Sequence, residues 1–383
     1  MLLPQSSYTS LLSPIPLTVA KLSLANFRNY VNLRLYFSTS TVVITGKNGC
    51  GKTNLLEAIS LLVPGRGLRH TPLNHLQNNK SNNFWATAID IRQGSTVMTI
   101  GTGRDFENTD NERRLVHIDG KNVKSHSILA EHVAMTWVTP DMDRILAEGA
   151  TMRRKFLDRL AYSFDPAHKG RLTRYEKALR ERLRLLREGF KDDSWLNALE
   201  NEMALTGVAI AATRRHLIRQ LRIAIGNTNS VFPKASLEIK GVAEESLENK
   251  PALLVEELLR EGYVRTRDED TQSGTCLLGP HRSDLVVFHQ GKNCLADLCS
   301  TGEQKALLLA IMIAYVRILI PTRNILPLFL LDDIAAHLDD IRRDALFEEI
   351  RFLGVQAWLT GTDVDSFSSI LPYAQHHRLE AQE

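Results

Sequence analysis

The chain has 383 residues, of which 43% are hydrophobic and 24% charged, the balance of a folded globular protein rather than a disordered one. This length allows one or two substantial hydrophobic cores and excludes a small disulfide-stabilised domain. The net charge is only +3, which by itself argues against a dedicated nucleic-acid-binding protein. The four cysteines show neither metal-ligand spacing nor a secretory pattern, so we expect a reducing, cytoplasmic compartment.

The sequence predicts neither a signal peptide nor a membrane span. The first 16 residues lack a basic start, and Pro4, Pro14 and Pro16 interrupt their apolar stretch, so we expect a loose extension over residues 1–16 rather than a signal peptide. The longest apolar run, around residues 306–320, is broken by Arg317. We therefore expect no membrane span.

The early part of the chain predicts mainly strands. Residues 17–45 alternate apolar and polar side chains and favour three strands. Residues 86–124 predict a further β-meander, in which Asp119 and Gly120 are typical of a tight hairpin turn. One helix is expected after Gly51. We assign residues 17–150 to the first part of an α/β domain.

The middle of the chain changes to helical periodicity. Residues 153–188 hold 12 Lys or Arg against 5 Asp or Glu, and leucines recur there at helical spacing. A second helical pattern covers residues 195–225, and the short loop between the two, with Gly189, suggests an antiparallel hairpin. Another short helix is expected over residues 251–263. Because strands return afterwards, we expect one α/β domain, residues 17–150 and 271–383, split by an inserted all-helical domain over residues 151–270.

A phosphate-binding motif lies near the start of the α/β domain. Residues 46–53 read GKNGCGKT and match G-x-x-x-x-G-K-[ST] in full, between an apolar strand and a helical pattern. Lys52 would reach the β and γ phosphates, and Thr53 would place its hydroxyl on magnesium. The alternative is a glycine-rich turn before a helix. The candidate nucleotide-binding residues of this segment are Gly46, Lys47, Asn48, Gly49, Cys50, Gly51, Lys52, Thr53 and Asn54.

Two carboxylates follow a late apolar strand. In LPLFLLDD, Asp332 would hold magnesium and Asp333 would stand where a general base can polarise the attacking water. The alternative is an acidic strand end before a helix N-terminus, where Asp is favoured in any case. Combined with the phosphate loop, the pair favours an ATPase with ATP and Mg²⁺ as cofactors.

A third motif lies shortly before Asp332. The segment Ser300, Thr301, Gly302, Glu303 and Gln304 resembles the S-x-G-x-Q signature of ABC-type ATPases. In such proteins the signature closes over nucleotide bound by a second subunit, and His337, Leu338 and Asp339 fit the loop that bridges the two subunits. The resemblance implies an ATP-dependent homodimer. The alternative is that Ser300 or Thr301 simply caps the following helix.

Eight motifs, taken in order, resemble the RecF family over residues 17–363. They are the FRNY segment ending at Tyr30, GKNGCGKTNLLEAI, GRGLR at 65–69, VTPD at 138–141, RRKFLDR at 153–159, LLGPHRSDL, STGEQK and LLDD. The resemblance implies a P-loop, ABC-type ATPase head related to SMC proteins, with a short helical domain in place of a long coiled coil. It also implies a DNA-stimulated, weak ATPase in recombinational gap repair and replication restart. Such proteins bind double-stranded and gapped DNA and act with RecR and RecO to direct RecA.

The same resemblance suggests further site residues and some departures. Arg66 and Arg69 are candidate DNA contacts, and Arg28 would contact nucleotide phosphate or, alternatively, form a salt bridge near a strand end. Thr136 stands where the family's magnesium-sensing glutamine is expected, and Ser283 where an acidic residue is usual. These departures concern the rate of hydrolysis more than the binding of nucleotide.

The basic charge is unevenly distributed. Residues 153–188 and 213–222 are strongly basic, which can mark a surface for DNA phosphates. The alternative is a solvated helix face with intrahelical pairs such as Glu181 with Arg184. Alternative functions are another SMC-like head in chromosome maintenance or a nucleotide-gated scaffold with vestigial hydrolysis; a transporter ATPase or a small-molecule kinase has no support in the motifs.

Overall fold

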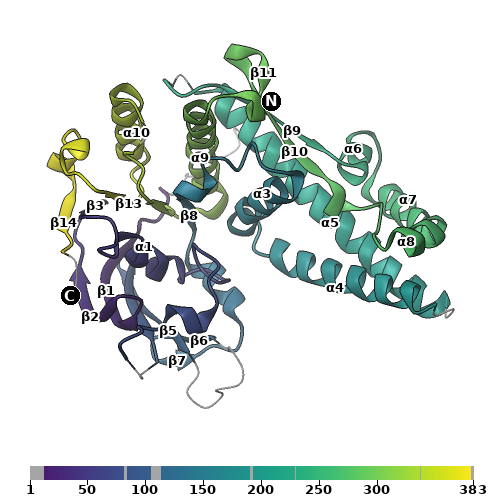
Figure 1. The fold of residues 1–383 in the computed structure, drawn as a ribbon, viewed down its shortest axis with the longest axis horizontal. Helices are drawn as coiled ribbons and strands as arrows, with labels where there is room; N and C mark the ends of the chain where they lie inside the picture. The colour runs from purple at the N-terminus through teal and green to yellow at the C-terminus, as the bar shows by residue number, and fades with distance from the viewer. Residues whose placement is uncertain are drawn as a thin grey trace, which may run out of the picture.

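The computed structural model describes residues 13–81, 84–104, 114–189, 193–228, 230–336 and 338–380. The predicted extension over residues 1–16 thus falls mostly outside the described residues. The described chain forms two lobes (Figure 1). A head holds both larger sheets, and a helical lobe is built around two long, adjacent helices, with further helices between the lobes.

The head is centred on a five-stranded parallel sheet of strand order β14-β3-β13-β12-β8. Its inner strands are short and wholly buried, as expected of a parallel sheet covered on both faces. Because the strands are parallel, their carboxyl ends lie at one edge. The strands are β14 (Gln375–Arg378), β3 (Thr41–Thr45), β13 (Ala357–Gly361), β12 (Leu328–Leu331) and β8 (Met135–Val138).

A six-stranded antiparallel sheet completes the head and confirms the predicted early strands and meander. Asp119 and Gly120 both have positive φ, 48° and 77°, and form the two-residue turn between β6 and β7 that the sequence predicts. The sheet contains, in spatial order, β2 (Tyr30–Tyr36), β1 (Leu17–Phe27), β4 (Ala86–Gln93), β5 (Thr96–Arg104), β6 (Arg114–Ile118) and β7 (Lys121–Asn122).

Helix α1 (Lys52–Ser60) follows β3, and α10 (Asp340–Leu353) follows β12. Helix α9 (Thr301–Arg323) is long and apolar enough to cross a membrane by length and composition, but 72% of its most apolar window is buried inside the protein. It packs against α5 (Asp193–Gly226), α3 (Ala150–Phe164) and β8 as a core helix. The apolar composition of α9 is therefore explained by its position between the lobes.

The helical lobe contains the predicted hairpin, formed by α4 (His168–Arg187) and α5, which lie side by side (Figure 1). The basic segment forms two helices, α3 and α4, rather than one. The lobe is completed by α6 (Val242–Asn249), α7 (Ala252–Arg265) and α8 (Arg267–Ser273), with the short α2 (Leu129–His132) in the head.

One strand interrupts the range that we predicted as all-helical. Strand β9 (Ala235–Lys240) pairs with β10 (Asp284–His289), which also pairs with β11 (Cys294–Leu295). Apolar and polar residues alternate in β9, a strand signal that we missed, whereas its pairing with residues on the other side of α6–α8 has no local signal. The small sheet links the helical lobe to the segment that leads into α9.

The helical lobe has a hydrophobic cluster of its own between α4, α5 and α7, which includes Tyr175, Met203 and Leu259. The larger cluster fills the head and continues into the far end of α5 through Leu217 and Leu221. Two clusters are consistent with a head and an inserted unit that share one long helix.

Candidate functional site

The phosphate loop lies between the carboxyl end of β3 and the first residue of α1. Gly49 and Gly51 have φ of 83° and 108°, a backbone region that favours glycine. A Cβ on Gly51 would lie 2.5 Å from the hydroxyl of Tyr30, so a side chain there would also clash. The backbone amides that follow form the N-terminus of α1, where anions are stabilised.

Lys52 is buried, and its ammonium lies over the loop itself. Nζ donates hydrogen bonds to the carbonyl oxygens of Gly46, at 2.7 Å, and Lys47, at 3.2 Å. The charge is thus held inside the curve of the loop. A phosphate oxygen placed there would replace these carbonyl oxygens as the acceptor of the Lys52 hydrogen bonds, and α1 would not have to move.

Asn29, which we did not single out from the sequence, connects the early strands to this loop. Its amide nitrogen donates to the carbonyl of Cys50 at 3.1 Å, and its amide oxygen accepts from Asn54 at 2.7 Å. Arg69 in turn donates to the amide oxygen of Asn54 at 3.1 Å. Three side chains therefore join the GRGLR segment to the phosphate loop.

Arg28 adopts the salt-bridge alternative. Its guanidinium pairs with the buried carboxylate of Glu57, with both N–O distances at 2.8 Å, and also donates to the Thr71 hydroxyl and the His75 carbonyl. A phosphate contact by Arg28 stays a prediction, and it would require the guanidinium to leave a buried carboxylate.

Three parallel strands bring a second group of side chains to the same edge. Asp332 follows β12, and its Oδ1 accepts hydrogen bonds from the hydroxyls of Thr53, at 3.1 Å, and Thr360, at 2.7 Å. The Thr360 hydroxyl also accepts the amide N–H of Asp333 at 2.7 Å. Thr53 and Asp332 are thus brought together as predicted, whereas Thr360, at the end of β13, was missed.

The two aspartates differ in environment. Burial raises the pKa of Asp332, although hydrogen bonds from Thr360 and Thr53 and the charge of Arg69 oppose the effect. Asp333 is half-buried and has a φ of 49°, uncommon for a residue with a side chain. A hydroxyl and a carboxylate oxygen form the hard donor set that Mg²⁺ prefers, so the residues present fit that ion.

The predicted signature begins α9. Ser300 caps the helix in a capping box with Glu303, whose side chain accepts the Ser300 amide at 3.1 Å. Ser300 and Thr301 are exposed, whereas Gln304 is buried and donates to the carbonyl of Cys299 at 2.9 Å. The helix-cap alternative is therefore present in the structure, and it leaves the hydroxyls of the signature on the surface.

Lys305, the last residue of the STGEQK motif, was also missed. It is buried, and its ammonium donates to the carbonyl of Ala336 at 3.0 Å and to Asp143 at 3.3 Å. Lys305 thus ties the signature helix to the loop that follows Asp333. His337, which we placed in the bridging loop, lies outside the described residues.

The expectation for Thr136 is wrong. Thr136 lies inside β8, buried and opposite Phe329, not in a loop at the edge where Asp332 is found. Ser283 stands where an acidic residue was expected, and its hydroxyl donates a hydrogen bond to the carboxylate of Glu244 at 2.7 Å. A carboxylate is thus present at that point, supplied by α6.

Seven of the 16 Lys and Arg side chains in the two basic segments form ion pairs within the described part of the chain, so their total charge overstates what is available to DNA phosphates. Arg182 is fully buried between Glu200 and Asp270, and Arg214 between Asp158 and Glu244. Burial alone would raise the pKa of Asp158, but Arg214 and His168 hold it below its usual range. Further pairs are Arg153 with Asp284, Arg171 with Asp165, Arg174 with Glu202, Arg215 with Glu248, and Arg184 with Glu181 and Glu188.

The two arginines of the GRGLR segment, Arg66 and Arg69, are exposed, and the segment rests on a buried cation. Beneath them, Arg114 donates to the carbonyl oxygens of Gly65, at 2.9 Å, and of Leu61, and burial lowers its pKa to about 10. Nothing in the sequence around Arg114 signals this support, because its partners are backbone groups far along the chain.

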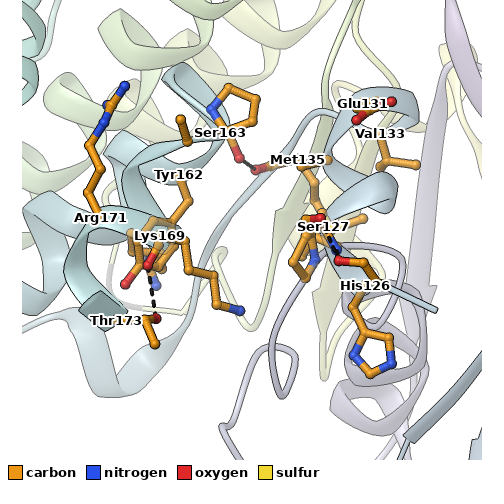
Figure 2. Close-up of a pocket in the computed structure, with 18 of the residues that line it drawn as sticks. His126, Ser127, Glu131, Val133, Met135, Tyr162, Ser163, Lys169, Arg171 and Thr173 are labelled. Carbon is orange, nitrogen blue, oxygen red and sulfur yellow. Dashed lines mark hydrogen bonds between the residues drawn. The ribbon is translucent and has the colours of Figure 1, made fainter. Parts of the chain in front are cut away.

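A cavity of about 1010 Å³ lies next to this segment, lined by Val63 and Pro64 just before it and by residues of α3 and α4. Its walls come from the loop around Ser127, from β8 and from the start of α4 (Figure 2). In Figure 2, Lys169 reaches into the space, whereas Arg171 points away from it. Burial lowers the pKa of His70, and the charges of Arg159, Lys155 and Lys169 lower it further, so these cations lie close to the GRGLR segment.

Comparisons with known proteins agree with this geometry. The family model described as RecF/RecN/SMC N terminal domain matches residues 18–363. A "DNA replication and repair protein RecF" from Mesorhizobium japonicum is 44% identical over 364 residues, covering 94% of this chain and 96% of the relative. One of the same name from Brucella suis is 41% identical over 373 residues, with 96% of each chain covered.

Solved structures match the same fold. The structure titled recombination mediator protein RecF-ATPrS in the RecFOR pathway superposes with a TM-score of 0.81 at 25% identity, covering 92% of this chain and 95% of the other. An Smc head domain from Pyrococcus furiosus has a TM-score of 0.51 at 17% identity, covering 95% and 94%, and shares the fold alone. By its motifs, its fold and its relatives, the chain belongs to the RecF family of the RecF/RecN/SMC ATPases.

Proposed function

We propose that this chain binds and hydrolyses ATP at the edge where β3, β12 and β13 end. The observation that carries the proposal is the hydrogen bond between Thr53 and Asp332, because it joins the phosphate loop to the strand-end carboxylate across 279 residues of sequence. Lys52 and the amides of the loop hold the phosphates. The relative solved with ATPrS supports ATP as the nucleotide.

The roles follow from the surroundings of each group. Thr53 and Asp332 hold Mg²⁺, which would neutralise phosphate charge when bound. Asp333, beside them and less buried, accepts the proton of the attacking water. Thr360 holds both aspartates in place through its hydroxyl.

We further propose that the signature acts on a second copy of the chain. Ser300 and Thr301 are exposed at the N-terminus of α9, an end that favours anions, and Lys305 couples that helix to the loop after Asp333. An ATP-dependent homodimer would then contain composite sites, each with a phosphate loop from one copy and a signature from the other.

DNA binding is proposed for three exposed cations, Arg66, Arg69 and Lys155, together with the half-buried Lys169, which lines the large cavity. They come from the head and from α3 and α4, so a DNA backbone across them would contact both lobes. The relatives' name supports DNA as a ligand, and the RecFOR title supports RecO and RecR as partners. We propose double-stranded and gapped DNA as the ligands and RecA as the protein directed to gaps from the resemblance of the motifs. We therefore propose a weak, DNA-stimulated ATPase that acts in recombinational gap repair.

The sharpest test of the composite site mixes two inactive variants. Ser300→Arg should leave nucleotide affinity near normal but abolish hydrolysis, because a bulky cation enters the partner's phosphate space. Lys52→Ala should lose nucleotide binding in its own loop. A mixture should regain part of the turnover, since one heterodimer site combines an intact loop with an intact signature. An active Ser300→Arg variant with turnover linear in protein concentration would leave the segment as a helix cap only.

DNA binding is tested by titrating gapped, duplex and single-stranded DNA with and without ATP over a range of salt. Affinity for duplex-containing DNA should increase with ATP and fall steeply with salt, because phosphate contacts release counterions. Binding indifferent to both ATP and salt would contradict the proposed surface.

A further inference from the structure

Two cysteines face each other immediately before the signature. The Sγ atoms of Cys294, in β11, and Cys299, after the short 3-10 turn Ala296–Leu298, lie 3.5 Å apart. Both are free thiols; Cys294 is half-buried, and Cys299 is 8% exposed. The first thiol is therefore open to a small solute, and the second lies directly behind it.

The backbone between these thiols is tied to the signature by several contacts. The amide of Cys299 donates to Ala296 at 3.2 Å, and its carbonyl accepts from the Gln304 side chain at 2.9 Å. Lys292, just before the pair, forms an ion pair with Glu303 of the capping box. A change at Cys299 is thus transmitted to the residues that position Ser300.

We propose that Cys294 and Cys299 are a modification site, at which hydrogen peroxide forms a reversible intrachain disulfide that disables the signature end of α9. The bond would close a small ring immediately before Ser300. Neither the phosphate loop nor the aspartates are needed for this chemistry, so it is a property of the chain separate from ATP hydrolysis.

The chemistry proceeds in two steps. The Cys294 thiolate attacks one peroxide oxygen, the O–O bond breaks, and protonation releases one water and leaves a sulfenic acid on Cys294. Cys299 then attacks that sulfur, an S–S bond forms, the S–O bond breaks, and the hydroxyl leaves as a second water. Two thiols lose two electrons and two protons, and the peroxide is reduced to two waters.

The order of attack follows from the surroundings of the thiols. Burial and the neighbouring Cys294 raise the pKa of Cys299 to about 11, so Cys299 stays protonated at neutral pH and suits the resolving position. Bond formation must bring the sulfurs from 3.5 Å to about 2.05 Å, which draws Cys299 toward β11. We expect this shift to strain the Gln304 contact and displace Ser300.

The first experiment tests bond formation alone. The reduced full chain is treated with hydrogen peroxide, denatured, and titrated for thiols, with peptide mapping by mass spectrometry. Titratable thiols should fall from four to two, and one peptide pair should link Cys294 with Cys299 and lose the mass of two hydrogens. Cys294→Ser and Cys299→Ser should not form the bond, whereas Cys276→Ser should form it. Four remaining thiols, or over-oxidation of Cys294 without a link, would overturn the proposal.

The second experiment tests the effect on the signature, and this part rests on the proposed function. Oxidised chain should lose most of its ATP hydrolysis and ATP-driven dimerisation, a reducing thiol should restore both, and Cys294→Ser should be insensitive to peroxide. A disulfide that forms with no effect on an active ATPase would overturn the coupling. Absence of hydrolysis in the reduced chain would instead count against the proposed function and leave the thiol result standing.

Discussion

The strand ends of the head and the helical lobe use charged side chains in opposite ways. At the strand ends of the head, Lys52, Asp332 and Asp333 are held by hydroxyls and backbone groups and have no ion-pair partner among the described residues. In the helical lobe, Arg182 and Arg214 are enclosed by carboxylates. A charge that meets no opposite charge within the chain is available for a ligand, whereas a paired one serves the fold.

The largest effect is expected where the charge is unpaired. Asp333→Asn should leave nucleotide binding intact and reduce turnover on the order of 100- to 10,000-fold, the usual contribution of a general base. Steady-state hydrolysis together with nucleotide titration separates the two effects. Asp268→Asn, an exposed change of the same kind in α8, should alter neither; unchanged turnover in Asp333→Asn would remove that residue from the catalytic role.

The paired charges should matter for stability instead. Arg214→Leu leaves Asp158 and Glu244 buried without their partner, so the free energy of unfolding should fall by about 3–5 kcal/mol. Arg184→Leu, whose exposed pairs lie on one helix, should cost less than about 0.5 kcal/mol. Denaturant unfolding of both variants measures the difference, and equal losses would contradict the contrast between the lobes.

The same network predicts the response to acid. The pKa of Asp158 is below its usual range in the folded protein, so the stabilisation from its ionised form is present above its unfolded pKa and is lost as the pH falls through the lower, folded value. In Arg214→Leu, burial without the cation should raise the pKa of Asp158, and acid should then cost less stability. Unfolding midpoints of the unmutated chain and of Arg214→Leu, measured from neutral to acidic pH, should converge as the pH falls.

Thr360→Val is expected to have a smaller effect in the head. It removes the hydroxyl that joins Asp332 to the Asp333 amide, at a cost of about 1–3 kcal/mol of stability. Turnover should fall as the aspartates lose their orientation. Thr360→Ser keeps the hydroxyl and serves as the control; if the serine variant behaves like the valine variant, the methyl group and not the hydrogen bond is what matters.

The smallest effect should come from single cations of the proposed DNA-binding surface. Lys155→Ala should reduce the dependence of log affinity for duplex DNA on log salt by roughly 0.9, one phosphate contact. Arg184→Ala, already paired with two carboxylates, should leave that dependence unchanged. Parallel salt titrations of the two variants would show whether unpaired cations, rather than total charge, carry the binding.

These differences also explain what could be predicted from the sequence. The phosphate loop and Asp332 each come directly after a strand that the local sequence pattern predicts. Both strands, and the meeting of their ends at one sheet edge, could therefore be predicted. Thr360 was not, because its position beside Asp332 depends on β13 inserting between β3 and β12. The burial of Arg182 and Arg214 could not be predicted either, because the carboxylates that enclose them lie on distant helices. A count of charged residues cannot separate buried arginines from exposed ones.

Strand order also has a consequence for how the protein is made. β3 is complete early in synthesis, yet its two neighbours, β13 and β14, belong to the last part of the chain. The backbone amide of Val19 likewise donates to the side chain of Gln356, which is made 337 residues later. The α4–α5 hairpin joins two helices that are neighbours in the sequence and pack against each other. We expect the helical lobe to fold first on the ribosome, while the ATP-binding edge assembles only as synthesis ends. A nascent chain would therefore have no working nucleotide site until nearly all of it had been made.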